Sequence, residues 1–158
     1  MRLYLAGPMR GVAHWNFPAF ATAAAALRAD GHTVLSPAEH DREVGWNPFD
    51  GAEPTAEQLA KMFQWDLASV VLGELDWAAD QLGAPPRYFP LDAVALLPGW
   101  RQSRGALLEV LVAVRCGLKL YQFEMGQVCD SGRHLREIQP PKLAVVLSES
   151  GRTIEVPA

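Results

Sequence analysis

Short apolar runs alternate with longer segments of helical periodicity along most of the chain. Such runs, bounded by Gly, Pro or Asp, are typical of buried strands, and the segments between them are typical of amphipathic helices. Strands that alternate with helices predict an α/β fold, an open sheet with a mostly parallel core. The expected strands are residues 2–6, 32–35, 91–97 and 118–123, and the expected helices are residues 17–29, 55–72 and 103–116.

The remaining segments carry weaker patterns. Residues 41–54 are rich in Gly, Pro, Asn and Asp, so they are expected to form a loop. Residues 75–83 (LDWAADQLG) are compatible with a helical turn, whereas residues 83–90 (GAPPRYFP) must be extended or looped. Near the C-terminus, two runs at 142–147 and 153–156 flank a turn sequence and predict a hairpin.

This topology selects three loops as a ligand-binding edge. In open α/β sheets, ligands bind beyond the carboxyl ends of the parallel strands. The segments that follow the first three expected strands are GPMRG (7–11), SPAEHD (36–41) and PGWRQS (98–103). We expect all three segments to lie along one edge of the sheet.

Composition narrows the class of protein. The 158 residues are 49% hydrophobic and carry a net charge of -4, which fits one soluble domain over residues 1–158. The negative charge and the scattered Lys and Arg residues argue against a nucleic-acid polymer as partner, and no apolar span indicates a membrane segment. Cys116 and Cys129 form no CxxC and no HExxH motif occurs, so we expect no metal and a cytoplasmic location.

Glu109 is the most unusual acidic residue, because it lies in the otherwise apolar helical segment LLEVLVAV. A lone Glu on a helix is usually structural, but an unpaired carboxylate among apolar neighbours is costly, which favours a functional role here. Asp66 and Asp92 are further candidates, although Asp66 fits a surface helix position and Asp92 fits a local cap. Tyr4, in the first strand, fits a core position. Asp, Glu and Tyr side chains near one strand edge favour glycosyl chemistry over acyl transfer.

Two backbone turns at the same edge are suited to an anion. Gly7 and Gly11 permit close backbone approach, and Arg10 between them offers a positive charge. Ser103 is a favoured N-cap, and Gly105 beside it leaves helix N–H groups open to an anion. A plain turn and a plain helix cap are equally good interpretations of these two segments.

Four segments in this order resemble the nucleoside 2-deoxyribosyltransferase-like family. They are YLAGPMRG, DLAS, LDAVALLPGW and S-R-G-A-x-x-E, and the resemblance spans about residues 2–123. The family includes 2'-deoxynucleoside 5'-phosphate N-hydrolases and short phage and bacterial members. The resemblance implies a Rossmann-like (flavodoxin-like) sheet of about five strands with helices on both faces, a homodimer or larger homo-oligomer, and cleavage of an N-glycosidic bond without a cofactor.

The resemblance also assigns roles to residues. It implies that Glu109 is the nucleophile, that Asp66 protonates the leaving base, and that Tyr4 lies beside the sugar. Ser103, where related transferases carry Asp, favours a 5'-monophosphate over a free nucleoside, because an Asp would repel the phosphate. The residues expected to bind substrate are Gly7, Pro8, Met9, Arg10 and Gly11 in the first loop, with Asp92, Ser103 and Gly105.

Two segments depart from the family pattern, and several functions stay open. Residues 71–90 contain an insertion, and residues 126–158 form a C-terminal extension without a resemblance. Hydrolysis of 2'-deoxynucleoside 5'-monophosphates is the preferred activity. The alternatives are base exchange by a nucleoside 2-deoxyribosyltransferase, cleavage of NAD or a modified nucleotide, and a nucleotide-binding module without catalysis.

Overall fold

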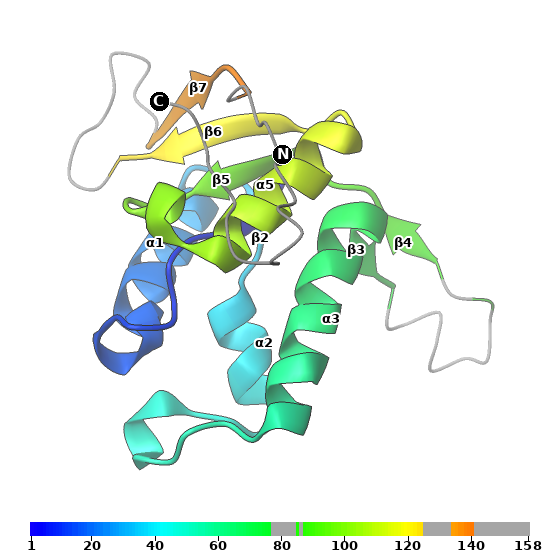
Figure 1. Cartoon of the computed structure of the whole chain (residues 1–158). Coiled ribbons are helices and arrows are strands. Elements are labelled where there is room, and N and C mark those ends of the chain that lie inside the picture. The colour runs from blue at the N-terminus through cyan, green and yellow to red at the C-terminus, as the bar shows by residue number, and fades with distance from the viewer. Residues whose placement is uncertain (77–84, 86, 125–133, 141–158) are drawn as a thin grey trace, which may run out of the picture.

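A five-stranded sheet forms the centre of the fold in the computed structural model, which describes residues 1–76, 85, 87–124 and 134–140 (Figure 1). The strand order is β2-β1-β5-β6-β7; the first four strands are parallel and β7 is antiparallel to β6. This arrangement confirms the predicted open α/β sheet with a mostly parallel core. The strands are β1 (Arg2–Ala6), β2 (Thr33–Leu35), β5 (Ala93–Leu96), β6 (Lys119–Phe123) and β7 (Leu135–Ile138).

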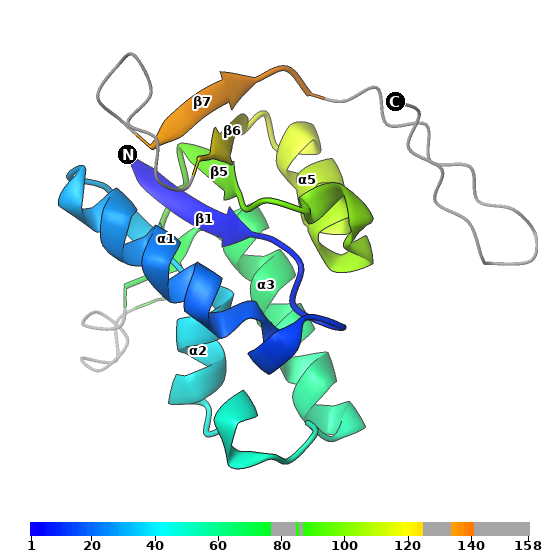
Figure 2. The same ribbon diagram turned by 90° about the vertical axis from the view of Figure 1, so that its left-hand side faces the viewer.

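Helices cover both faces of this sheet (Figure 2). On one face, α1 (Phe17–Ala29) packs against Leu3 and Leu5 of β1. On the other face, α3 (Ala56–Leu72) and α5 (Arg104–Arg115) contribute to a second apolar cluster, which contains Tyr4 and Ala6. The alternation of side chains along β1 therefore supplies both halves of the core. None of the described helices is both long and apolar enough to cross a membrane.

The strand β5, predicted at residues 91–97, is apolar throughout because helices cover both faces of the sheet. Every residue of β5 is fully buried, because the strand lies between β1 and β6 and is covered by helices on both sides. Continuous apolar runs are typical of central parallel strands. Its neighbour Asp92 precedes the strand and is exposed.

The structure differs from the sequence prediction after β2, where a short helix, α2 (Pro37–Glu43), begins at once. The expected loop at 41–54 is therefore wrong over its first three residues. Ser36 is the N-cap residue and Pro37 occupies the first helical position, where its missing N–H costs nothing. A helix of seven residues is too short to show a clear periodicity. In both ribbon views, α2 lies beside α3 (Figures 1 and 2).

Short elements complete the described chain. Two strands, β3 (Glu74–Leu75) and β4 (Tyr88–Phe89), form a separate antiparallel pair that flanks the predicted insertion. The helical turn expected within 75–83 falls largely on residues 77–83, and the expected C-terminal hairpin falls on 142–156; both lie outside the described residues. The three 3-10 helices are η1 (Ala13–Asn16), η2 (Pro48–Asp50) and η3 (Trp100–Gln102).

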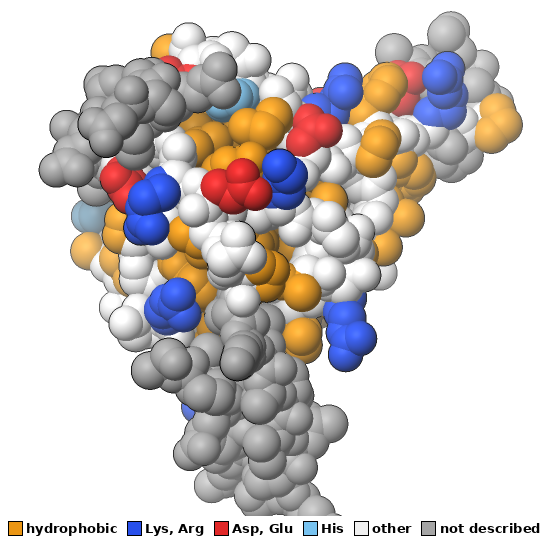
Figure 3. Space-filling view, turned by 90° about the horizontal axis from the view of Figure 1, so that it is seen from above, with side chains coloured by type: hydrophobic (Ala, Val, Ile, Leu, Met, Phe, Trp, Pro, Cys, Tyr) orange, Lys and Arg blue, Asp and Glu red, His pale blue; other side chains and the backbone are white. Residues whose placement is uncertain are grey.

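Among the described strands, β7 is at one edge of the sheet, and it carries charges of both signs. Arg136 pairs with Glu124 at 2.6 Å, and Glu137 pairs with Lys119 of β6 at 3.6 Å. Figure 3, which views the molecule from above Figure 1, shows acidic and basic side chains intermingled with apolar ones on this face. Charged side chains on an edge strand discourage pairing with the strand of another molecule.

Candidate functional site

A cavity of about 820 Å³ lies beyond the carboxyl ends of β1 and β5, where the topology predicted a site. Its walls come from the loop after β1, the start of α5, and the facing parts of α2 and α3. The volume is within the ordinary range for small-molecule sites. Of the residues predicted from sequence, the cavity brings together Gly7, Met9, Arg10, Asp66, Ser103, Gly105 and Glu109.

Glu109 lies on the buried face of α5 and points at β1 rather than at solvent. Its side chain is 6% exposed, and its Oε1 accepts a hydrogen bond of 3.0 Å from the hydroxyl of Tyr4. Tyr4 is fully buried in the middle of β1, two residues before the carboxyl end of the strand. The sequence interpretation of Tyr4 as a core residue is confirmed, and the structure also brings it into contact with Glu109.

Burial controls the protonation of this pair. It raises the pKa of Glu109 well above the ordinary value; the nearby charge of Asp66 acts in the same direction, and the hydrogen bond from Tyr4 opposes it. Burial also raises the pKa of Tyr4 well above the ordinary value. Tyr4 is therefore a neutral phenol that donates to Glu109.

Asp66 of α3 is the second carboxylate of the cavity. Burial raises its pKa to about 7, although interaction with the Tyr4 hydroxyl lowers it. Its Oδ1 is shielded from solvent and has no hydrogen-bond partner in the described part of the protein. The charge of Asp66 raises the pKa of Glu109, and the charge of Asp41 raises the pKa of Asp66. Hydrogen bonding to Tyr4 lowers the pKa of both carboxyl groups, so their proton uptake is linked.

The start of α5 forms the cationic side of the cavity. Ser103 is the N-cap, and its Oγ accepts from the N–H of Ala106 at 3.3 Å, so the expected cap is confirmed. The first hydrogen bond along the helix backbone runs from Leu107 to the Ser103 carbonyl, which leaves the N–H groups of Arg104 and Gly105 outside the helical ladder. The side chains of Arg10 and Arg104 line the same cavity.

The loop after β1 is held close to the loop after β5. A Cβ at Gly7 would lie 2.8 Å from the Cβ of Leu97, so only glycine permits this approach. Gly11 has a φ of +79°, a conformation that favours glycine. Pro8 accepts a hydrogen bond of 2.8 Å from the Asn16 side chain. Pro8 and Gly11 shape the loop without being among the residues that line the cavity.

Asp92 was a substrate-binding candidate, but it is not among the residues that line the cavity. It precedes β5, so it lies at the amino end of the strand, across the sheet from the cavity. Its Oδ2 accepts a hydrogen bond of 2.7 Å from the backbone N–H of Arg2. The alternative interpretation, a local structural partner, describes its position.

Asp41 and Trp15 are among the cavity-lining residues that were not predicted as site residues. Asp41 of α2 is 4% exposed and lines the cavity, and its Oδ1 has no hydrogen-bond partner in the described residues. Trp15 also lines the cavity, within a run of three left-handed residues whose φ values are 50°, 50° and 60°. Such conformations are costly for residues with a Cβ and concentrate at functional sites. Asp41 is the last residue of the segment SPAEHD, which the topology selected as part of the ligand-binding edge, so that rule was the available signal for Asp41; Trp15 had none.

Comparison with known proteins identifies the family. The profile of a family described as a domain of unknown function, DUF4406, matches residues 1–62 and 88–122, which is more than half of the chain. The chain belongs to the DUF4406 family. The DUF4406 match includes Tyr4, the first loop, Ser103 and Glu109, and it omits residues 63–87, which contain Asp66 and most of the predicted insertion. A search of the curated proteins finds no match to this DUF4406 chain.

The described residues hold no cluster of three or more His, Cys, Asp or Glu side chains arranged to bind a metal ion. The carboxylates of the cavity are instead placed around Tyr4 and the apolar wall.

Proposed function

We propose that this protein hydrolyses the bond between base and sugar in 2'-deoxynucleoside 5'-monophosphates. The observation that carries the proposal is the pairing of Glu109 with Tyr4 beside a cavity that also holds Asp66 and the start of α5. Two carboxylates of raised pKa next to each other are typical of sites that need one nucleophile and one acid. The resemblance to nucleoside 2-deoxyribosyltransferase-like enzymes assigns the same residues.

The reactive form of the pair carries a proton on Asp66 and none on Glu109. In the first step, the ionised Oε of Glu109 attacks the anomeric carbon of the sugar. The bond from that carbon to the base nitrogen breaks, and its electron pair stays on the base, which takes a proton from Asp66. The Tyr4 hydroxyl, a neutral donor at 3.0 Å, stabilises the carboxylate of Glu109 before the attack. The product is a deoxyribosyl ester of Glu109 and a free base, as in retaining glycosidases.

In the second step, water attacks the anomeric carbon and releases Glu109. Asp66, now ionised, accepts the proton of that water, so both carboxylates return to their starting states. If a second base attacks instead of water, the same ester yields a new nucleotide, which is the transferase alternative. The two reactions differ only in the acceptor.

The charges along the cavity favour a phosphate at one end and a base at the other. Arg10, Arg104 and the first N–H groups of α5 are suited to an anion, because helix N-termini and guanidinium groups both stabilise phosphate. Asp41 and Asp66 each have one carboxylate oxygen without a hydrogen-bond partner in the described chain. A base with amino or ring N–H groups would satisfy these acceptors.

Release of free base, measured by chromatography, tests the proposal. Purified protein is incubated with each of the four common 2'-deoxynucleoside 5'-monophosphates and with the matching nucleosides. We expect base and deoxyribose 5-phosphate from at least one nucleotide, and slower or no release from its nucleoside. Release from nucleosides alone would contradict the assigned phosphate end. Adding a second base distinguishes exchange from hydrolysis.

The resemblance also implies a homodimer or a larger homo-oligomer. Light scattering coupled to size-exclusion chromatography measures this directly. A mass equal to that of one chain at the concentrations used for activity would contradict this part of the proposal.

A further inference from the structure

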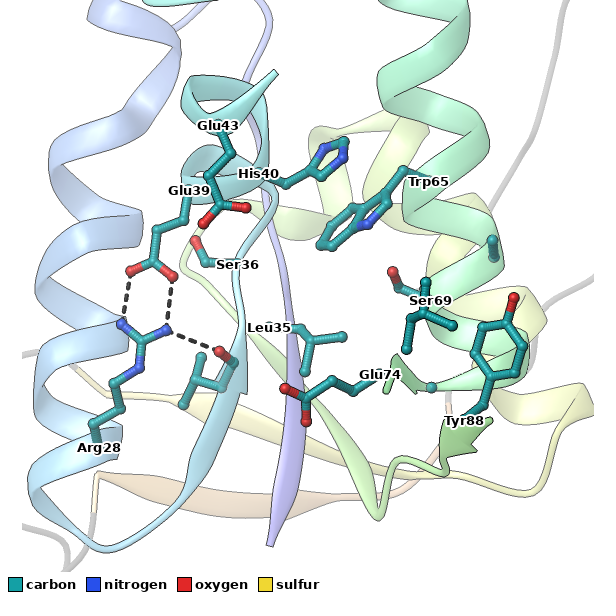
Figure 4. A pocket seen from close by; sticks show the side chains of 14 residues that line it. Arg28, Leu35, Ser36, Glu39, His40, Glu43, Trp65, Ser69, Glu74 and Tyr88 are labelled. Carbon is teal, nitrogen blue, oxygen red and sulfur yellow. Dashed lines mark hydrogen bonds and ion pairs between the residues drawn. The ribbon is translucent and has the colours of Figure 1, made fainter. Parts of the chain in front are cut away.

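A second cavity, of about 430 Å³, lies between β2, α2 and α3 (Figure 4). It is separated from the first cavity by His40 and Trp65, whose rings stack with centroids 4.0 Å apart. The residues that follow them, Asp41 and Asp66, line the first cavity instead. The proposed N-glycosidase reaction does not use this second cavity.

Carboxylates outnumber free cations around the second cavity. Three of the lining side chains are Glu39, Glu43 and Glu74. The cation Arg28 is already occupied, since it donates two hydrogen bonds of 2.7 Å to Glu39 and one of 2.9 Å to the carbonyl of Val34. Glu43 forms no ion pair within the part of the chain that the structure describes, and Glu74 meets Nε of Arg2 at 3.5 Å. The cavity therefore keeps an excess of negative charge.

A buried hydroxyl in the same cavity has no partner. Ser36 is 3% exposed and lines the cavity, and its Oγ forms no hydrogen bond within the described residues. Ser36 is the residue before α2, but its side chain does not cap the helix. Buried polar groups are almost always hydrogen-bonded, so an unpaired hydroxyl on a residue that lines a cavity indicates a missing partner.

The acceptors lie at two ends of the cavity, with an apolar surface between them. In Figure 4, Glu43 and Ser36 lie toward the α2 end and Glu74 lies toward the opposite end. Leu35 lies between them, and the indole of Trp65 forms part of the wall. A ligand that fits this pattern has a positive charge at each end and methylene groups in the middle, because ammonium groups pair with carboxylates and alkyl chains pack on apolar surface.

We propose that this second cavity is a binding site for an aliphatic diamine or polyamine, held between Glu43 and Glu74, with one ammonium group donating to Ser36. The site is independent of the proposed hydrolase activity. Its ligand pairs with two carboxylates that lie on different elements, α2 and β3, so affinity depends on the length of the methylene chain. Nonspecific attraction to an acidic protein has no such dependence.

Calorimetric titration of the full chain with putrescine, cadaverine and spermidine tests this site, with butylamine as the single-charge control. We expect saturable binding with an optimum in chain length, and affinity that is about 3- to 5-fold lower for butylamine. E43Q and E74Q are each expected to weaken binding by about 3- to 5-fold, and the double variant by about 10-fold or more. E53Q, which removes an exposed charge away from the cavity, is the matched control and should change affinity less than about 2-fold.

The variant Ser36→Ala adds a second test that does not alter charge. Because the Ser36 side chain makes no cap bond, its removal should leave the melting temperature unchanged. It should lower the affinity for putrescine by about 3-fold. Equal affinity of the wild type and the E43Q/E74Q double variant would overturn the proposal. An absence of saturable binding for all three amines at low salt would also overturn it.

Discussion

The two ends of the central sheet place a carboxylate in opposite environments, one buried and one exposed. At the carboxyl end, Glu109 is 6% exposed and accepts from a fully buried phenol, Tyr4. At the amino end, Asp92 is exposed and accepts from the backbone N–H of Arg2. Both residues lie beside apolar segments in the sequence. The difference shows that position relative to the direction of the strands, rather than apolar surroundings alone, separates a candidate catalytic carboxylate from a structural one.

Replacing Glu109 by Gln should have the largest effect. The amide oxygen can still accept from Tyr4, so the fold is retained, but the nucleophile is lost. We expect base release from the best nucleotide to fall by about 10⁴-fold or more, measured by chromatography. The melting temperature of the variant should be equal to or higher than that of the wild type, because a buried carboxylate is removed. Unchanged base release from E109Q would exclude Glu109 as the nucleophile.

The next largest effect is expected for Asp66→Asn, which cannot donate a proton to the leaving base. The rate of base release should fall by about 10²- to 10⁴-fold. In the wild type, the same rate should decline as pH rises above about 7, where Asp66 loses its proton. A rate that keeps rising from pH 6 to about pH 9 would contradict the role of Asp66 as the acid.

Asp66→Asn should also change the stability profile. Since burial raises the pKa of Asp66 to about 7, the folded state binds more protons than the unfolded state between about pH 4 and pH 7. The stability of the wild type should therefore fall over that range as pH rises, relative to the variant. Above pH 7, the unfolding free energy of the wild type should be lower than that of the variant by roughly 2–4 kcal/mol, measured by urea denaturation. Parallel profiles for both proteins would contradict the raised pKa.

Ser103→Asp sharpens the assignment of the phosphate end. Asp is as good an N-cap as Ser, so α5 and the melting temperature should be preserved. The added charge should repel a phosphate, lowering kcat/KM for a nucleotide by about 10- to 100-fold while affecting the matching nucleoside much less. Equal loss on both substrates would show that Ser103 does not face the phosphate.

The smallest effect on activity is expected for Asp92→Asn, at the opposite end of the sheet. Base release should change by less than about 2-fold, since the residue is far from the cavity along the strand. The unfolding free energy should fall by about 0.5–1.5 kcal/mol, because a charged acceptor of the Arg2 N–H becomes neutral. A large loss of activity without loss of stability would restore Asp92 to the site.

The sequence predicted the features that depend on local chemistry. The bounds of α1 agree with the expected helix at 17–29, and the cap at Ser103 follows from residue type alone. The rule that ligands bind beyond the carboxyl ends of parallel strands then predicted that Glu109 and the first loop lie at one edge of the sheet. Asp92 precedes the third expected strand, so the same rule already excludes it from the carboxyl edge. Its partner, the N–H of Arg2, lies 90 residues away in the sequence and could not be predicted from the local pattern.

The features that sequence could not predict depend on contacts between distant segments. The helix α2 has seven residues, too few for periodicity, and its packing beside α3 brings Asp41 into the cavity. The position of Trp15 depends on three successive left-handed residues, which no propensity favours. The second cavity combines β2, α2, α3 and the β3–β4 pair, so it exists only in the folded chain.

Capture of the covalent intermediate tests the assignment of Glu109 most directly. The wild-type protein is mixed with its best 2'-deoxynucleoside 5'-monophosphate, quenched rapidly in acid, digested and analysed by mass spectrometry. We expect the peptide that contains Glu109 to gain the mass of one deoxyribose 5-phosphate group, and no gain in E109Q. Release of free base with no adduct on Glu109, or with the adduct on another residue, would contradict the proposed reaction.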